Sequence, residues 1–204
     1  MRFPHPLLVC DIGGTNVRVA VSRTRGAPPE MIFKARTTDH PDLASVLGGA
    51  ARAAAIDARS AIVCAAGPVE GACVSLTNAE WSIDGRKTAA ALGLDQGLLL
   101  NDFEAQAIAL PYLPTAATRE IAAGEPHAGA PMLVLGPGTG LGAAALLRVD
   151  GKWTPVTTEA GHAGFAPQGA DEQAIWPHLE RAHGRVTFES VLSGPGLAHL
   201  YAAL

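Results

Sequence analysis

The sequence predicts an α/β fold, and two glycine-rich turns are the main reason. One lies in residues 7–16 (LLVCDIGGTN) and the other in residues 132–142 (MLVLGPGTGLG). Each follows an apolar run of strand type, and strand-like and helix-like segments alternate between them. Glycines at such turns let the backbone approach a bulky group and present N–H groups to it, and phosphate is the usual group. The pattern favours a protein that holds a phosphate chain from two sides.

The residues after each turn predict a second strand rather than a helix. Residues 17–22 (VRVAVS) alternate in the manner of a strand after the first turn. After the second turn, residues 143–149 form an apolar run that ends in Asp150-Gly151, a dipeptide typical of two-residue hairpins. We therefore expect each glycine turn to join two strands.

This hairpin pattern disfavours two common nucleotide-binding loops. A dinucleotide-binding fingerprint can be matched to Gly138, Gly140 and Ala143, with Glu159 about 20 residues further on, but that motif opens a helix. A P-loop needs Gly-Lys followed by Ser or Thr, whereas Trp153 follows the Gly-Lys pair of this chain.

The remaining segments give an alternating order of elements and one candidate boundary. The first helix is expected from about Pro41 to Asp57, with Asp39 or His40 near its start. Residues 111–131 are rich in Pro, Gly, Thr and Ala, which predicts two domains, 1–112 and 113–204. Strands are expected at 7–12, 16–22, 31–36, 61–65, 74–76 and 98–100, a mixed loop at 157–170, and helices at 41–57, 84–92, 102–110, 171–183 and from 195 onward.

Composition narrows the class of protein. Apolar residues make up 48% and charged residues 17% of 204 residues, enough for a substantial core. The net charge of −4 gives no excess of basic residues, so we expect neither nucleic acid nor an anionic membrane to be the main partner. The cysteines show no metal-binding spacing; Cys10 is expected to be buried, and a Cys64–Cys73 disulfide is disfavoured. Without a recognisable signal peptide or membrane span, we expect a cytoplasmic protein.

Five segments, in this order, resemble the bacterial glucokinase family of sugar kinases. They are DIGGTNVRVAV, LLLNDFEAQAIAL, LVLGPGTGLGAA, TEAGHAGFAP and ESVLSGPGL. The resemblance runs from residue 7 to about residue 204. It implies an actin-like, ribonuclease-H-like ATPase fold with two α/β domains around a cleft. Relatives with a zinc cluster of closely spaced cysteines are a poorer match, since that cluster is absent from the sequence.

The resemblance also implies an activity, namely ATP-dependent phosphorylation of glucose to glucose 6-phosphate. Its implied cofactors are ATP and Mg²⁺, its substrate is glucose, and a homodimer is a further option. Two alternatives stay open. One is a kinase for another hexose, such as mannose or an amino sugar. The other is a non-catalytic sugar-sensing protein on the same fold, although such regulators usually carry a DNA-binding helix-turn-helix ahead of the first strand, which here begins at residue 7.

Asp102 is the candidate catalytic residue. It follows Asn101 between a predicted strand and a predicted helix, the place where open α/β sheets bind ligands. The helix start should keep its carboxylate ionised, and a carboxylate there could accept a proton from an attacking hydroxyl. From the residues alone, a role as helix N-cap is an equal alternative. The resemblance implies that Asp102 is the general base on the sugar 6-hydroxyl.

The resemblance implies sugar contacts from further residues. Glu159 and His162 lie among small residues, which would let both side chains converge on a polyol, and Ala160 stands where the family usually has glycine. From the residues alone, simpler roles stay open: Glu159 as a solvated surface charge, His162 as a structural loop histidine, and Glu189 as a first-turn glutamate that the helix dipole favours. Trp81 is expected to pack rather than to stack on a sugar. The implied sugar-binding set is Asn78, Asn101, Asp102, Glu159, His162 and Glu189.

The two turns supply the implied nucleotide-binding residues. Asp11 would hold Mg²⁺ through its water shell, because Mg²⁺ keeps most of its waters. The phosphates would be held by Gly13, Gly14, Thr15 and Asn16 in the first turn and by Gly138, Thr139 and Gly140 in the second.

The end of the sequence carries one more expectation. Members of the family continue well beyond the position that matches Leu204, so the second domain is expected to be incomplete. In the final helical run, Leu197, Leu200, Tyr201 and Leu204 fall on one apolar face that needs a partner. We expect residues 1–204 alone to bind ATP poorly and to associate through exposed apolar surface.

Overall fold

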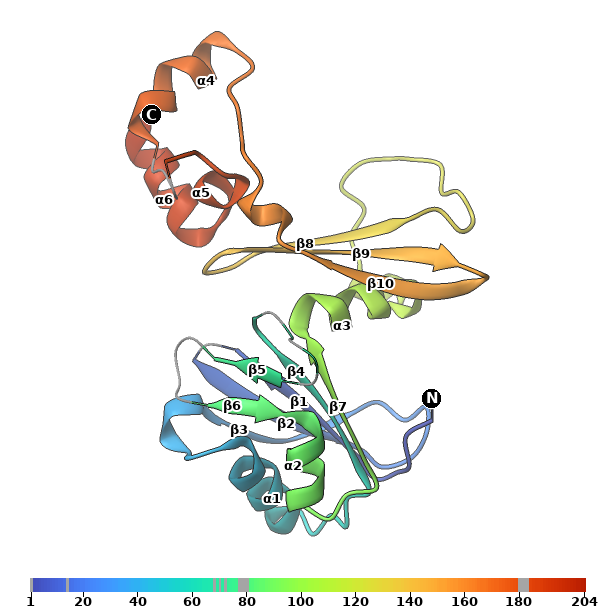
Figure 1. The fold of residues 1–204 in the computed structure, drawn as a ribbon. Helices are drawn as coiled ribbons and strands as arrows, with labels where there is room; N and C mark the ends of the chain where they lie inside the picture. Colours follow the sequence, from blue (N-terminus) through green and yellow to red (C-terminus); the bar gives the residue numbers. More distant parts are fainter. Residues whose placement is uncertain are drawn as a thin grey trace. The chain divides into compact units, whose positions relative to one another are not determined.

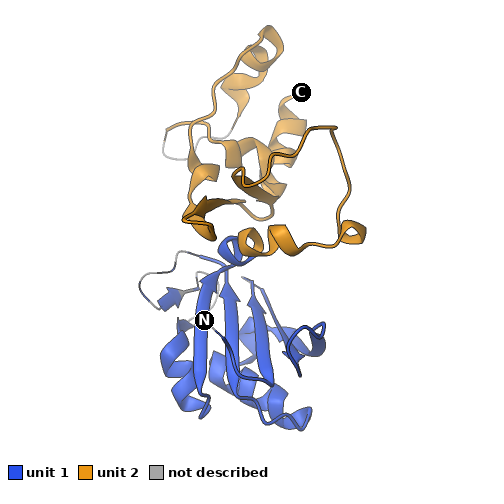
Figure 2. Ribbon diagram, turned by 90° about the vertical axis from the view of Figure 1, so that its right-hand side faces the viewer, with its two compact units in different colours: residues 1–105 blue, residues 106–204 orange. Residues whose placement is uncertain are grey.

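The computed structural model describes residues 2–13, 15–67, 69, 71, 73–76, 81–179 and 184–204. The chain forms two compact units, residues 1–105 and residues 106–204 (Figure 2). The functional division at residues 112/113 stays a prediction, because compactness alone does not show where a two-domain protein bends.

Unit 1 is built on a five-stranded sheet with the order β3-β2-β1-β4-β7 (Figure 1). The first three strands are antiparallel, whereas β1, β4 and β7 run parallel. Ile12 pairs with Ala65 and Ala65 with Asn101, so the carboxyl ends of the parallel strands share one edge. The strands are β1 (Leu7–Ile12), β2 (Asn16–Ser22), β3 (Glu30–Arg36), β4 (Ser60–Ala65) and β7 (Gln96–Asn101).

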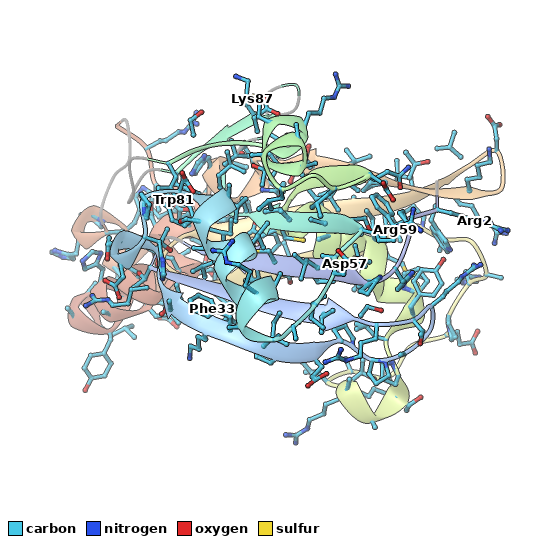
Figure 3. The ribbon with its side chains drawn as sticks, turned by 90° about the horizontal axis from the view of Figure 1, so that it is seen from below. Arg2, Phe33, Asp57, Arg59, Trp81 and Lys87 are labelled. Carbon is cyan, nitrogen blue, oxygen red and sulfur yellow. The ribbon has the colours of Figure 1, made fainter. Side chains whose placement is uncertain are left out.

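The core of unit 1 lies between this sheet and two helices, α1 (Leu43–Ala53) and α2 (Gly85–Ala91). Trp81 is part of this core and donates from Nε1 to the His40 carbonyl at 3.1 Å, so its expected packing role is confirmed. Lys87 projects from α2 into solvent (Figure 3). The fully buried members of the core include Leu8, Ile12, Val17, Val19, Val21, Val46, Leu47, Val74 and Ile83.

Two predictions for unit 1 need correction. The first helix covers Leu43–Ala53 rather than 41–57, and its cap is neither Asp39 nor His40: the Asp42 carboxylate accepts from the Ser45 N–H at 2.7 Å and caps it there. A short 3-10 turn, η1 (Thr37–Asp39), precedes it. Strand β6 (Ser82–Asp84), which pairs with β5 (Cys73–Ser75), was missed because three residues show no periodicity.

Unit 2 contains an antiparallel sheet with the order β10-β9-β8. Its strands are β8 (Met132–Pro137), β9 (Leu141–Val149) and β10 (Lys152–Thr158). Asp150 and Gly151 have φ angles of 49° and 74°, as the predicted two-residue hairpin requires. Both glycine turns join two strands, which confirms the predicted hairpins and contradicts a dinucleotide-binding fingerprint.

The rest of unit 2 is made of short helices. A small core of Leu179, Val186 and Val191 packs against Phe165 and Trp176. The helix predicted at 171–183 is wrong in length, because Pro177 has no N–H for an α-helical bond and Leu179 is extended; residues 180–183 lie outside the described residues. The elements are α3 (Asp102–Ala109, across the unit boundary), η2 (Leu110–Tyr112), η3 (Thr115–Ala117), η4 (Ala160–His162), α4 (Ala170–Ile175), η5 (Trp176–His178), α5 (Phe188–Leu192) and α6 (Gly194–Ala203).

The buried position of Cys10 agrees with the sequence interpretation. Cys10, Cys64 and Cys73 are free thiols, with Cys10 buried as expected. In the part of the chain that the structure describes, no helix is long and apolar enough to cross a bilayer.

Candidate active site

The first glycine turn is closed by backbone hydrogen bonds. The Gly13 N–H donates to the Asn16 carbonyl at 2.9 Å. The N–H of Thr37, a fully buried residue, donates to the Thr15 carbonyl at 3.0 Å, so η1 supports the turn from behind. Gly14 lies outside the described residues.

Asp11 is paired with an arginine that the sequence interpretation missed. Arg18 lies directly opposite it on β2, and Nη1 is 2.9 Å from Asp11 Oδ2. Both side chains are half exposed. The signal was present in the sequence, because pairing residues across the first turn in antiparallel register places Arg18 opposite Asp11.

Asn101 and Glu104 cap the start of α3. Asn101 Oδ1 accepts from the N–H groups of Phe103 and Glu104 at 3.0 and 3.1 Å, while Glu104 Oε2 accepts from the Asn101 N–H at 3.3 Å. This is the reciprocal arrangement of a capping box. Asn101 Nδ2 also donates to the Gly67 carbonyl at 3.0 Å. The helix is thus capped by Asn101, which removes the N-cap role as the explanation for Asp102.

Asp102 is half-buried at the carboxyl edge of the parallel strands. Burial raises the pKa of its carboxyl, and the nearby Asp11 charge adds to this, although hydrogen bonds such as that from the Phe103 N–H at 2.9 Å oppose it. We expected the start of α3 to keep this carboxylate ionised. Burial has the larger effect, so the pKa of Asp102 is raised instead. A carboxylate with a raised pKa is a stronger proton acceptor.

Cys64 lies on β4 at the same edge. Burial and the charges of Asp11, Asp102 and Glu104 raise the pKa of its thiol to about 11. The thiol therefore stays protonated at neutral pH and is a poor nucleophile. Among the described residues, no group of three or more His, Cys, Asp or Glu side chains could hold a metal ion on its own.

In unit 2, the predicted sugar-binding residues lie in contact with each other. His162 Nδ1 is 3.5 Å from Glu159 Oε2, and His162 Nε2 is 3.6 Å from Glu189 Oε1. Glu159 precedes the turn η4 and His162 is its last residue. Glu189 lies in the first turn of α5, which Thr187 and Ser190 close with a capping box. The three side chains come from two separate motifs and form one polar row.

The second glycine turn is bonded to these same motifs. The Leu141 N–H donates to Glu189 Oε2 at 2.8 Å, and the Gly194 N–H donates to the Gly138 carbonyl at 2.8 Å. Thr139 lines a pocket of about 170 Å³ with other residues of unit 2. The structure thus brings together Gly138, Thr139, Gly140, Glu159, His162 and Glu189 in unit 2, and Asp11, Asn101 and Asp102 at one edge in unit 1; Asn78 lies outside the described residues.

The fold with its two glycine hairpins is the actin-like ATPase fold that sugar kinases share. A solved glucokinase from an Antarctic psychrotroph is 32% identical, with a TM-score of 0.83 over 97% of this chain and 63% of its own. A glucokinase from Balamuthia mandrillaris, solved in complex with glucose, is 22% identical with a TM-score of 0.67 over 96% of this chain and 61% of its own, and it supports the fold alone.

The sequence comparisons give the family. A model of the glucokinase family matches residues 8–204. The glucokinase of Brucella suis biovar 1 (strain 1330) is 41% identical over 99% of this chain and 59% of its own length. The chain belongs to the glucokinase family, as the five motifs predicted, and it spans about 59% of the length of such relatives.

Proposed function

We propose that the protein is an ATP-dependent kinase that phosphorylates glucose at its 6-hydroxyl, with Asp102 as general base. The observation that carries this proposal is the state of Asp102. Its carboxylate lies at the carboxyl edge of the parallel strands, the N-cap of α3 is supplied by Asn101, and burial raises its pKa. A carboxylate that only capped a helix would show neither of these last two features.

In the proposed reaction, the 6-hydroxyl oxygen forms a bond to the γ-phosphorus of ATP. The bond between that phosphorus and the bridging oxygen breaks, ADP leaves, and the hydroxyl proton passes to Asp102. Because phosphoryl transfer depends mostly on positioning and charge stabilisation, a carboxylate of modestly raised pKa is a sufficient base. The raised pKa of Asp102 supports this role.

The glycine turns are the proposed phosphate-binding elements. In unit 1, Gly13 would shape the turn through its N–H bond to the Asn16 carbonyl, and Gly14, Thr15 and Asn16 would offer backbone N–H groups to phosphate oxygens. In unit 2, Gly138 would shape the turn through its N–H bond to the Gly140 carbonyl, and Thr139 and Gly140 would offer theirs. The tight hydrogen bonds within both turns support this, since a rigid turn presents its N–H groups without further ordering.

Asp11 is the proposed contact to Mg²⁺. Its exposed carboxylate shares only Oδ2 with Arg18, so Oδ1 is outside that pair and suits a water of the metal's shell. Since the described residues hold no larger acidic group, a loosely held, phosphate-bound Mg²⁺ fits better than a protein-caged ion. When bound, Mg²⁺ neutralises charge on the transferring phosphates.

Glu159, His162 and Glu189 are the proposed hydroxyl ligands in unit 2, and Asn101 the ligand beside Asp102, with Asn78 as a further candidate. Carboxylate oxygens accept from sugar hydroxyls, and the imidazole can accept or donate. Within the described residues Asn101 Nδ2 makes one hydrogen bond, to the Gly67 carbonyl, which leaves its second N–H for a sugar oxygen. Cytoplasmic location and a homodimer stay predictions.

A coupled assay of ADP formation across glucose, mannose and N-acetylated amino sugars, run on a chain of the full length of the relatives, tests this function. We expect the highest kcat/KM with glucose. Turnover only with another hexose would replace glucose by that sugar and keep the kinase. Glucose binding measured by calorimetry without any ADP formation would favour the sugar-sensing alternative.

A further inference from the structure

Gly140 leaves room for the carboxylate of Glu189. A methyl group on the Gly140 backbone would lie 2.5 Å from Glu189 Oε2 and 3.2 Å from its Cδ. These are atoms at the far end of a flexible side chain, so an alanine at this position can be accommodated if the carboxylate moves away. The position therefore controls where the Glu189 carboxylate lies.

Glu189 joins the glycine turn to the polar row of the proposed sugar ligands. One carboxylate oxygen accepts from the Leu141 N–H at 2.8 Å, and the other lies 3.6 Å from His162 Nε2. A carboxylate that accepts from a backbone N–H is held by a charge-assisted hydrogen bond, which is stronger than a neutral one. The bond to Leu141 thus orients the oxygen that faces His162.

Backbone contacts hold the same segments together. Gly161, in η4 of the sugar loop, packs directly against the Leu141 carbonyl, and the Gly194 N–H donates to the Gly138 carbonyl at 2.8 Å. The turn, the loop with His162 and the start of α6 therefore form one connected region of unit 2. In this region, the Glu189 side chain links the second glycine turn to His162.

We propose that Gly140 is a positioning residue for the sugar site, acting through Glu189. Because it lacks a side chain, the Glu189 carboxylate can stay on the Leu141 N–H and face the sugar ligands. A residue of the nucleotide turn thereby sets sugar affinity in the absence of nucleotide. In the reverse direction, Glu189 holds the turn in shape for phosphate. This inference rests on the proposed function.

The test measures glucose affinity by calorimetry, without nucleotide, in a double-mutant cycle of Gly140→Ala and Glu189→Ala. We expect Gly140→Ala to weaken glucose binding about tenfold, the scale of one misplaced charge-assisted hydrogen bond. In the Glu189→Ala background, the same change should cause no further loss, because its effect passes through Glu189. Gly169→Ala is the matched control, since an added methyl there meets no atom within 4 Å and the residue lies in unit 2 outside both proposed sites, so its glucose affinity should stay unchanged.

The reverse direction gives a second measurement that does not need the glycine variant to fold. Without sugar, Glu189→Ala should weaken ATP binding about tenfold, because Leu141 loses its hydrogen-bond partner. His162→Ala should leave ATP binding unchanged, since among the described residues the His162 side chain contacts Glu159 and Glu189. Unchanged ATP affinity in Glu189→Ala would overturn the link.

Two outcomes of the cycle would also overturn the inference: wild-type glucose affinity in Gly140→Ala, or losses that add fully in the double variant. Both leave the proposed kinase function standing. Failure of the unsubstituted protein to bind glucose is a different result, because it would overturn the proposed function and this inference with it.

Discussion

Asn101 and Glu104 cap the start of α3 from opposite directions. The amide oxygen of Asn101 accepts from the Glu104 N–H at 3.1 Å, while the carboxylate of Glu104 accepts from the Asn101 N–H at 3.3 Å. The helix start is thereby fixed without Asp102, which lies between them. A catalytic carboxylate in the first turn of a helix can have its direction set by neighbours that take over the capping, and we infer that arrangement here.

The capping pair predicts a stability difference between two variants. Asn101→Ala should lower the free energy of unfolding by about 1–2 kcal/mol, because it deletes an N-cap that accepts two backbone N–H groups. Glu104→Gln should change it by less than about 0.5 kcal/mol, since Gln also serves in a capping box. Urea titration followed by tryptophan fluorescence measures both. Equal stability of Asn101→Ala and wild type would contradict the cap.

The raised pKa of Asp102 predicts the acid limb of the reaction. The base must be ionised, so kcat should fall as pH drops through a pKa that lies above the ordinary aspartate value of 3.8. Rates at saturating glucose and ATP between about pH 4 and pH 8 measure this limb, with fluorescence confirming that the protein stays folded. If the pKa that governs the fall of kcat lay at or below the ordinary value, burial would not be what sets the pKa of Asp102.

The same shift predicts that Asp102 opposes folding at neutral pH. A carboxyl whose pKa is raised by folding binds its proton more tightly in the folded state; its stabilising contribution is present below the unfolded pKa and lost as pH rises through the folded pKa. Asp102→Asn should therefore raise the urea midpoint at pH 7 and lose this advantage in acid. Asp95→Asn, which removes an exposed charge paired with Arg59, is the control and should not raise it. A lower midpoint for Asp102→Asn would contradict burial as the cause.

We expect the polar row in unit 2 to determine the affinity for glucose and not the affinity for ATP. Glu159→Ala and His162→Ala should each weaken glucose binding, because a hydrogen bond to a charged group is worth about 1.5–3 kcal/mol. Their effects on nucleotide binding should be much smaller. Calorimetric titration with glucose and with ATP separates the two. Unchanged glucose affinity in both variants would mean that this loop is only structural.

The local elements of the fold were predictable because their signals are short-range. Strand alternation around both glycine turns and the Asp150-Gly151 dipeptide gave the hairpins. The capping of α3 was also readable, since Asn101 and Glu104 stand three residues apart in the pattern of a capping box. The end of α4 was also predictable from Pro177, which the expected helix at 171–183 did not take into account.

The contacts of the candidate site were not predictable in the same way. The bond between Glu189 and the Leu141 N–H spans 48 residues, and nothing in either motif indicates it. The direction of the Asp102 pKa shift depends on burial by the folded sheet edge, which the helix-start argument does not contain. Such features arise from tertiary packing, so they became visible only in the structure.

Single-turnover phosphoryl transfer in Asp102→Asn tests the central claim most directly. The asparagine keeps a hydrogen-bonding group for the sugar hydroxyl but cannot take its proton. With Asp95→Asn as the charge-matched control, we expect the transfer rate to glucose to fall about 10²–10⁴-fold while glucose affinity on the same preparation stays close to wild type. Transfer at a near wild-type rate in Asp102→Asn would contradict the assignment of Asp102 as the general base.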